Sequence, residues 1–358
     1  EPAMKNVCTN LLAASIILAA VFCNGCTKQG NDKVIRLNYS IFFPPTHVHT
    51  KLAQDWAEEI SKRSNGRVEI RIFPGGILTK ADHCYSGVID GISDIGMSSF
   101  AYTRGRFPLL EGLDLPLGYY DGVSATRVAN EMLKKYQPKE LKSTHMLFVH
   151  AHGPGILASR KPIRTLKDTE GLSCRGTGFS AKIVDLLGGN SIGMPQNDTY
   201  EALQKGVVEA TLCPIETLKG WKQGEVINYV TATPAIGYTT AMFVTMNRQK
   251  WNSLPPEIKK IFEEVSNEWI DKHGKAWNDA DNEAREMLAE MGKEIIELPE
   301  EETKKWQEKI RPILDIYAKA AEAKGLPGNA FLADMLNAVK RNNAISAKEN
   351  EVLNGTDK

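Results

Sequence analysis

The strongest constraint on the fold is one uninterrupted helical pattern, residues 256–291. Beyond Pro256 at its first position this stretch contains no proline and a single glycine, Gly274. Its apolar residues recur at helical spacing, as Ile258, Ile261, Phe262, Val265, Trp269 and Ile270. A helix of about 35 residues is roughly 50 Å long, which exceeds the width of one small domain. The pattern therefore predicts a helix that runs across two domains.

Strand and helix patterns alternate over the rest of the chain. Residues 34–43, 68–73 and 94–99 have the β-rich composition or the alternation of strands, and helical spacing separates them. This order predicts an α/β unit with a largely parallel sheet. A second strand–helix series begins near residue 146, and residues 241–247 form a further strand. Two α/β units in tandem enclose a cleft between them.

We assign domain limits from these patterns. Domain I is expected to comprise residues 34–152 and about 240–275, and domain II residues 153–239 and about 276–342. A final helix is expected over roughly residues 300–324. The polar residues 343–358 are expected to form a flexible tail.

The N-terminus has the order of a secretory signal. Residues 1–3 precede Met4 and are interpreted as an addition before the natural start; Lys5, an apolar run over 11–22 and small residues before Cys26 follow. The run is short for a membrane span, so cleavage and export to the periplasm are expected, with a buried or anchoring helix as the alternative. Cys23 to Cys26 also resemble a bacterial lipobox, although a leucine is usual where Cys23 stands. Lipidation of Cys26 is left open.

Composition excludes several classes of partner. Lysine plus arginine and aspartate plus glutamate both number 44, so no net field attracts nucleic acid or an acidic membrane. No phosphate-binding loop or dinucleotide fingerprint is found, and no cofactor is expected. Beyond the signal three cysteines remain, Cys84, Cys174 and Cys213, which allow one disulfide of unknown pairing.

Two enzyme-like patterns are weak. Residues 189–193, GNSIG, match a serine nucleophile motif at Ser191, but here a helix precedes and a strand follows, the reverse of what the motif requires. Two His-x-His pairs, His47/His49 and His150/His152, share faces as alternate strand residues do, yet no acidic or cysteine ligand is suitably spaced. We expect neither a hydrolase nor a metal site.

Arg175 is the more informative residue. It lies at the carboxyl end of a predicted strand, where open α/β sheets place ligand-binding groups. Gly176 and Gly178 are expected to leave room over the guanidinium, whose rigid fork matches a carboxylate. On these grounds alone, a surface arginine and an anion-binding arginine are both tenable.

The chain resembles the solute receptors of tripartite ATP-independent periplasmic (TRAP) transporters. The matching stretches lie in order at residues 44–47 (PPTH), 66–78 (GRVEIRIFPGGIL), 91–99 (GISDIGMSS), 107–116 (FPLLEGLDLP), 166–175 (LKDTEGLSCR) and 198–210 (DTYEALQKGVVEA). The resemblance implies a two-domain α/β periplasmic binding protein fold in which a long helix spans both domains. It also implies a monomeric, non-enzymatic receptor that binds a small organic acid and delivers it to the membrane subunits of the transporter.

The resemblance also implies a site. The family's carboxylate-binding arginine falls on Arg175, and other cleft positions fall on Phe42, Ser98, Ser99 and Cys213. Further wall residues are expected at Phe43, Tyr102, His152, Phe179, Trp221 and Tyr238.

Two departures from the family pattern bear on the ligand. Cys213 stands where many relatives have asparagine, and Gly155 lies near the position of a second arginine in receptors for sugar acids. A monocarboxylate with a hydrophobic or aromatic body, such as a keto or hydroxy acid, is therefore expected. A receptor for another carboxylate that feeds a sensor is the alternative.

Overall fold

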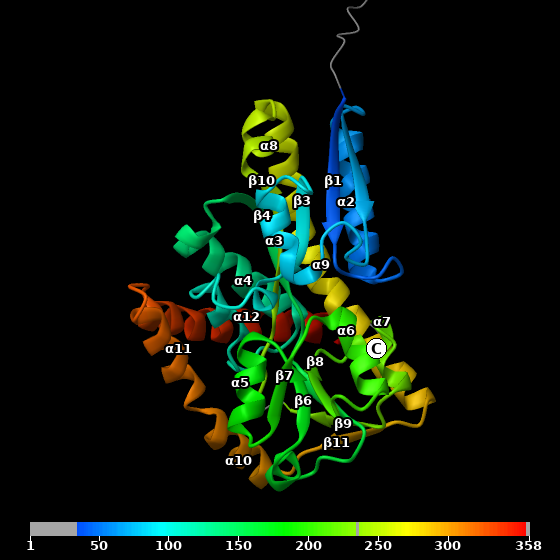
Figure 1. Cartoon of the computed structure of the whole chain (residues 1–358), viewed down its shortest axis with the longest axis vertical. Helices are drawn as coiled ribbons and strands as arrows, with labels where there is room; N and C mark the ends of the chain where they lie inside the picture. Colours follow the sequence, from blue (N-terminus) through cyan, green and yellow to red (C-terminus); the bar gives the residue numbers. More distant parts are fainter. Residues whose placement is uncertain (1–33, 234–235, 356–358) are drawn as a thin grey trace, which may run out of the picture. The chain divides into compact units, whose positions relative to one another are not determined.

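The computed structural model describes residues 34–233 and 236–355, and within them two β-sheets (Figure 1). The predicted additional residues 1–3, export signal and Cys26 lie outside the described residues. No helix within the described ranges has both the length and the apolar character needed to cross a membrane.

The first sheet has five strands in the order β2-β1-β3-β10-β4. Its strands are β1 (Ile35–Ile41), β2 (Val68–Phe73), β3 (Ile95–Ser99), β4 (Thr144–Ala151) and β10 (Ala241–Asn247). β1 and β3 are parallel, but β10 is antiparallel to both β3 and β4. β1, β3 and β4 therefore run in the same direction and β10 in the opposite one, so the expectation of a largely parallel sheet is confirmed for these strands except β10. The exception arises because β10 returns from the second sheet and enters between two strands that come earlier in the chain.

The second sheet has six strands in the order β11-β9-β5-β8-β6-β7. They are β5 (Ile156–Ser159), β6 (Ser173–Gly176), β7 (Asn190–Gly193), β8 (Ala210–Cys213), β9 (Tyr229–Ala232) and β11 (Glu294–Glu297). β6 is parallel to β7 and β8, whereas β5 is antiparallel to β8 and β9. Arg175 pairs with Ile192 on one side and Thr211 on the other, so β6 holds it inside the sheet.

Helices flank both sheets. They are α2 (Val48–Arg63), α3 (Cys84–Ile89), α4 (Gly122–Tyr136), α5 (Gly178–Leu186), α6 (Gln196–Gln204), α7 (Thr217–Gly220), α8 (Arg248–Ser253), α9 (Pro256–Glu290), α10 (Glu300–Ile310), α11 (Ile313–Glu322) and α12 (Gly328–Gly355). α9 is the predicted long helix. It packs against α2, α4 and β4 beside the first sheet and against α7 beside the second (Figure 1). The prediction of one helix that serves both sheets is confirmed.

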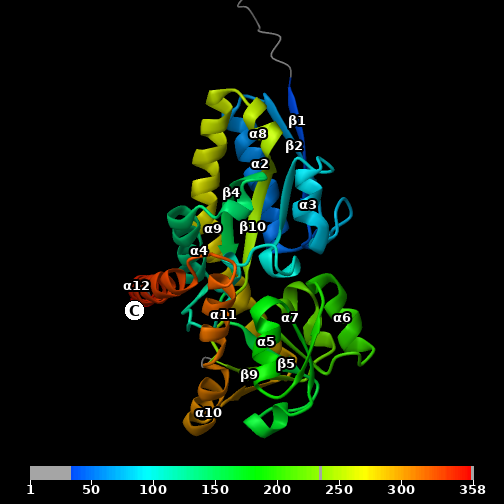
Figure 2. The same ribbon diagram turned by 60° about the vertical axis from the view of Figure 1, so that its left-hand side comes forward.

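The C-terminal region differs from expectation. The single helix predicted over residues 300–324 is divided into α10 and α11 at Pro312, which has no backbone N–H to continue the hydrogen-bond ladder. Residues 343–355, expected as a flexible tail, continue α12. Figure 2 shows α12 lying beside α4, where Ser346 donates a hydrogen bond to Asp121 and Glu349 pairs with Arg127. These polar residues are held by ion pairs that composition does not reveal.

One large apolar cluster joins the two sheets. It includes Phe243 of β10 and Leu212 of β8, together with Phe179 of α5, Tyr317 of α11 and Phe331 of α12. A second cluster underlies α6 and α7 and includes Leu203, Leu218 and Leu288. Buried apolar side chains therefore connect strands of both sheets with the C-terminal helices.

Candidate functional site

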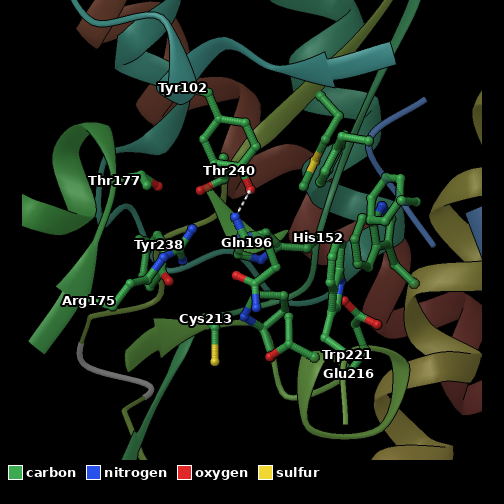
Figure 3. Close-up of a pocket in the computed structure, with 16 residues that line it drawn as sticks. Tyr102, His152, Arg175, Thr177, Gln196, Cys213, Glu216, Trp221, Tyr238 and Thr240 are labelled. Carbon is green, nitrogen blue, oxygen red and sulfur yellow. Dashed lines mark hydrogen bonds between the residues drawn. The ribbon is translucent and has the colours of Figure 1, made fainter. Parts of the chain in front are cut away.

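A cavity lies where strand ends of the two sheets approach each other. The atom-free space enclosed by its lining, including the part open to solvent, is about 380 Å³. The first sheet and its flanking segments contribute side chains at the end of β1, after β3 and at the start of β10; the second contributes side chains from β6, α6, β8 and α7 (Figure 3). The lining residues are Phe42, Phe43, Tyr102, His152, Arg175, Thr177, Gln196, Cys213, Pro214, Glu216, Thr217, Trp221, Tyr238, Thr240, Met242 and Trp277.

Arg175 is the cation of this cavity. Its side chain is at the carboxyl end of β6 and only 4% of the residue is exposed. Nε donates to the carbonyl of Met194 (3.1 Å) and one terminal nitrogen donates to that of Leu212 (3.2 Å). Among the described residues, no aspartate or glutamate forms an ion pair with it. A buried guanidinium without a counter-ion is costly, so the site is electrostatically incomplete without an anion.

Six of the nine predicted site residues are brought together in this cavity. They are Phe42, His152, Arg175, Cys213, Trp221 and Tyr238, and the expected wall residues Phe43 and Tyr102 also line it. The structure thus collects in one place residues that are as far apart in the sequence as the end of β1 and the segment before β10.

Three predicted residues do not line the cavity. Ser98 donates its hydroxyl proton to the carbonyl of Ala81 (2.6 Å), and Ser99 uses its oxygen to accept the N–H of Ala101 (3.1 Å) at the start of a 3₁₀ turn. Phe179 packs edge-on against Tyr317 in the core, with centroids 5.7 Å apart. Each side chain is already engaged locally, which explains why proximity to a strand end did not bring it to the cavity.

The two glycines beside Arg175 are not clearance for a ligand. A Cβ on Gly176 would lie 2.8 Å from backbone atoms of Ala181, so this glycine permits α5 to pack closely on β6. Gly178 has φ +50° and begins α5. Both serve the strand-to-helix turn that places Arg175.

Gly155 packs closely against Tyr238. A Cβ there would lie 2.0 Å from Cε1 of Tyr238, and the Gly155 N–H donates to the Tyr238 carbonyl (2.9 Å). The Tyr238 ring therefore occupies the space that a side chain at position 155 would need. This chain has an aromatic wall where the resemblance places a second arginine.

Aromatic rings form one wall of the cavity. Phe42 is stacked with Trp221 at a centroid distance of 5.9 Å and meets Tyr102 edge-on at 5.5 Å. Phe43 lies 4.1 Å from Phe42 and stacks on His47 at 4.3 Å. Because β1 ends at Ile41, these two phenylalanines follow the strand directly into the cavity. The wall is suited to contact with a flat apolar body.

Several polar lining residues were not predicted. Gln196 begins α6 directly after Pro195, and Glu216 immediately precedes α7. Thr177, Thr217 and Thr240 add hydroxyl groups. Pro195 and Pro214 mark the turns that precede Gln196 and Glu216. These prolines are the one local signal that could have pointed to the two residues.

Glu216 connects the second sheet to the first. Its Oε2 lies 3.1 Å from Nε2 of His47, the N-cap residue of α2, and both side chains are buried. Asn197 makes a second connection, donating to the Phe42 carbonyl (3.0 Å). The Glu216 N–H donates to Asp281 of α9 (3.1 Å). Burial and the nearby Glu216 charge raise the pKa of Asp281 to about 7.

The two His-x-His pairs contribute to a buried histidine cluster. His49, His150 and His273 of α9 lie together, with Nδ1 of His49 and of His273 2.8 Å apart. The rings of His150 and His273 are nearly parallel, at 9° and 4.3 Å between centroids. In-plane lone pairs of parallel rings point side by side and do not converge on one ion, so the arrangement is poorly shaped for a metal. Burial lowers the pKa of all three imidazoles.

The candidate nucleophiles are three cysteines and Ser191. Cys84, Cys174 and Cys213 are all free and buried, so no disulfide links them. Burial raises the pKa of the Cys213 thiol to about 11. Ser191 lies inside β7, not at a strand-to-helix turn, and it does not line the cavity. The arrangement around the cavity is that of a binding site built on a buried cation.

Comparison with known proteins identifies related chains. Residues 39–320 match the family described as bacterial extracellular solute-binding protein, family 7 (DctP). A TRAP periplasmic solute-binding protein from Desulfovibrio salexigens is 32% identical, with 86% of this chain and 96% of that chain covered and a TM-score of 0.75. Its structure is an open complex with the C-terminus of a symmetry mate in the ligand-binding site.

Two further solved structures carry small acids. A TRAP periplasmic solute-binding protein from Bordetella bronchiseptica, with bound (R)- and (S)-mandelate, is 29% identical over 86% of this chain and 99% of that one, with a TM-score of 0.80. A TRAP solute-binding protein from Rhodoferax ferrireducens, in complex with copurified benzoate, is 25% identical over 87% and 100% of the two chains, with a TM-score of 0.83.

Proposed function

Because the chain belongs to family 7 of the bacterial extracellular solute-binding proteins, we propose that it is a TRAP transporter receptor for a small organic monocarboxylate with a hydrophobic or aromatic body. The observation that carries the proposal is Arg175, a buried guanidinium that has no counter-ion among the described residues. A ligand carboxylate supplies the missing negative charge.

Capture, not catalysis, is the proposed mechanism. Two N–H groups of Arg175 are committed to the carbonyls of Met194 and Leu212, which fixes the plane of the guanidinium. Its remaining N–H groups are proposed to form a bidentate pair with the carboxylate. The first sheet then closes on the second, and exclusion of water strengthens the ion pair. The His47–Glu216 and Phe42–Asn197 contacts join the two sheets in this arrangement.

The body of the ligand is proposed to lie against the aromatic wall. Phe42 and Trp221 present stacked faces, and Tyr238 fills the space over Gly155. A heavily hydroxylated sugar acid or a dicarboxylate needs more charged or polar partners than this wall offers. Mandelate and benzoate, the acids in two related structures, are monocarboxylates with an aromatic ring.

The proposal extends to location and partners. Residues 4–26 are proposed to direct export to the periplasm, with Cys26 as a candidate site of lipidation. The receptor, a monomer, would meet the membrane only through that anchor or through the membrane subunits on which it docks. A receptor for a carboxylate that feeds a sensor is the alternative, and the identity of neighbouring genes distinguishes the two.

Matched acids and amides test the function. Purified protein is heated with benzoate, phenylacetate or mandelate, and in parallel with benzamide, phenylacetamide or mandelamide. Each amide keeps the ring and loses the negative charge. Acids are expected to raise the melting temperature by mass action while amides leave it unchanged. The proposal would be rejected if the amides raised the melting temperature as much as the acids do. It would also be rejected if none of the acids raised it.

A further inference from the structure

Two buried polar atoms of the cavity have no hydrogen-bond partner. They are Oε1 of Glu216 and Nε2 of Gln196, and the two residues are 2% and 5% exposed. Both residues line the cavity that also contains Arg175. Buried polar groups are nearly always paired, and an unpaired charged one is costly. These two atoms therefore mark where a ligand is expected to make polar contacts in addition to its carboxylate.

The geometry around His47 shows which oxygen of Glu216 is occupied. The backbone N–H of His49 donates to Nδ1 of His47 (3.3 Å), so Nδ1 carries a lone pair. The ring proton is then on Nε2, which donates to Oε2 of Glu216 (3.1 Å). This hydrogen bond occupies Oε2 and leaves Oε1 of Glu216 as a buried acceptor without a partner.

His152 adds a second acceptor. Its Nδ1–H donates to the carbonyl of Gly153 (2.5 Å). Burial lowers the pKa of His152 to about 4, so the ring is neutral at pH 7 and Nε2 holds a lone pair. The cavity thus offers acceptors from Glu216 and His152 as well as the donors of Arg175.

The cation and the carboxylate of the cavity are on opposite sides of it. Figure 3 shows Arg175 on one side and Glu216 beside Trp221 on the other, with Cys213 and Gln196 between them. No ion pair joins Arg175 and Glu216 among the described residues. A ligand that satisfies both ends must carry a negative group at one end and a hydrogen-bond donor at the other.

We infer that the ligand is an aromatic carboxylate with a hydroxyl or N–H group on the ring end away from the carboxylate, and that Glu216 selects for this donor. The inference rests on the proposed function, because it takes Arg175 as the site of the carboxylate. A retained water molecule is the competing occupant of the position next to Oε1. In that case ligands with and without a donor bind alike.

Matched ligands of similar size test the selection. Calorimetry compares 3-hydroxybenzoate with 3-fluorobenzoate, and 4-hydroxyphenylacetate with 4-fluorophenylacetate, because fluorine resembles a hydroxyl in size but donates no proton. A hydrogen bond to a charged acceptor is expected to favour the hydroxy acid of at least one pair by about tenfold or more. Equal binding within both pairs, or no binding by any member, overturns the inference.

Variants assign the preference to Glu216. Glu216→Gln keeps the shape and removes the charge, so the preference is expected to shrink; Glu216→Met removes the acceptor and is expected to abolish it. Glu283→Gln is the matched control, because it breaks the Lys219–Glu283 ion pair (2.7 Å) on the exposed face near α7 and does not line the cavity. The preference of Glu283→Gln for the hydroxy acids over the fluoro acids is expected to equal that of the wild type.

The outcomes separate the two proposals. If the acids bind but the hydroxy preference is absent, or persists undiminished in Glu216→Gln and Glu216→Met, the inference falls and the carboxylate receptor stands. If amides bind as well as acids, the proposed function falls. Thermal melting of the ligand-free variants checks folding; should Glu216→Met not fold, the comparison of wild type with Glu216→Gln decides.

Discussion

Replacement of Arg175 by methionine should separate a ligand-binding role from a structural one. Methionine fills a similar volume without charge. Removal of one partner of a buried, hydrogen-bonded charge pair costs about 2–5 kcal/mol. The affinity for benzoate or 3-hydroxybenzoate is therefore expected to fall by roughly thirtyfold to several thousandfold at 25 °C. Titration calorimetry of both proteins measures this loss.

The stability of the ligand-free protein should change much less. The variant loses two hydrogen bonds from a charged group, to Met194 and Leu212, each worth about 1.5–3 kcal/mol. It is also relieved of the destabilisation caused by a buried cation without a counter-ion, which amounts to several kcal/mol. The two contributions oppose each other, so the free energy of unfolding is expected to change by less than about 2 kcal/mol. Urea unfolding measures it.

Arg175→Lys provides the matched control. It keeps the positive charge but loses the planar fork, so it should bind the acid with an affinity between those of the wild type and the methionine variant. Binding by Arg175→Met within about threefold of the wild type, less than 1 kcal/mol, would refute the reasoning. Large destabilisation with unchanged affinity would instead assign Arg175 to the fold.

Three further predictions concern the surroundings of the site. Gly155→Ala places a Cβ 2.0 Å from the Tyr238 ring and should lower the free energy of unfolding in urea by about 1–3 kcal/mol, with partial recovery in the double variant Gly155→Ala/Tyr238→Leu; an unchanged stability would contradict the packing. Trp221→Ala removes the ring stacked on Phe42 and should weaken benzoate binding about tenfold in calorimetry, while a small aliphatic acid such as lactate is affected less; equal losses for both acids would argue against the aromatic wall. Burial lowers the pKa of His273 to about 3, so between that value and pH 6.5 the unfolded chain binds a proton at this residue that the folded chain does not. The free energy of unfolding is therefore expected to decrease as the pH falls below 6.5, by up to about 1.4 kcal/mol per pH unit for this histidine. His273→Asn should flatten that slope in urea titrations at pH 7.5, 6 and 5, and an identical slope would count against it.

Sequence patterns predicted the parts of the fold that repeat regularly. The period of apolar residues in 256–291 predicted α9 nearly to its last residue, because a long buried stripe leaves no other conformation. The place of β10 between β3 and β4 could not be read in the same way, since strand order depends on pairings between distant residues. Pro312 divides a helix whose apolar spacing alone looked continuous.

The site was predictable at the carboxyl ends of buried strands. Arg175 lies near the end of β6 and Phe42 directly follows β1, and both line the cavity. Ser98 and Ser99 also lie at a strand end, but their hydroxyls bond to Ala81 and Ala101, and no pattern in the sequence distinguishes that use from ligand binding. Gln196 and Glu216 were missed because they stand at helix N-termini, as the first residue of α6 and the residue before α7, where side-chain direction depends on tertiary structure.

The free thiol of Cys213 gives this chain a built-in reporter. It is fully buried and lines the cavity, whereas Cys84 and Cys174 are buried elsewhere. If the sheets open and close as proposed, a thiol-modifying reagent is expected to reach Cys213 only while they are apart, so the modification rate would report the frequency of opening. A bound acid would slow the reaction in proportion to its occupancy. Mass spectrometry of the labelled protein would then measure the opening rate of the receptor without any attached probe.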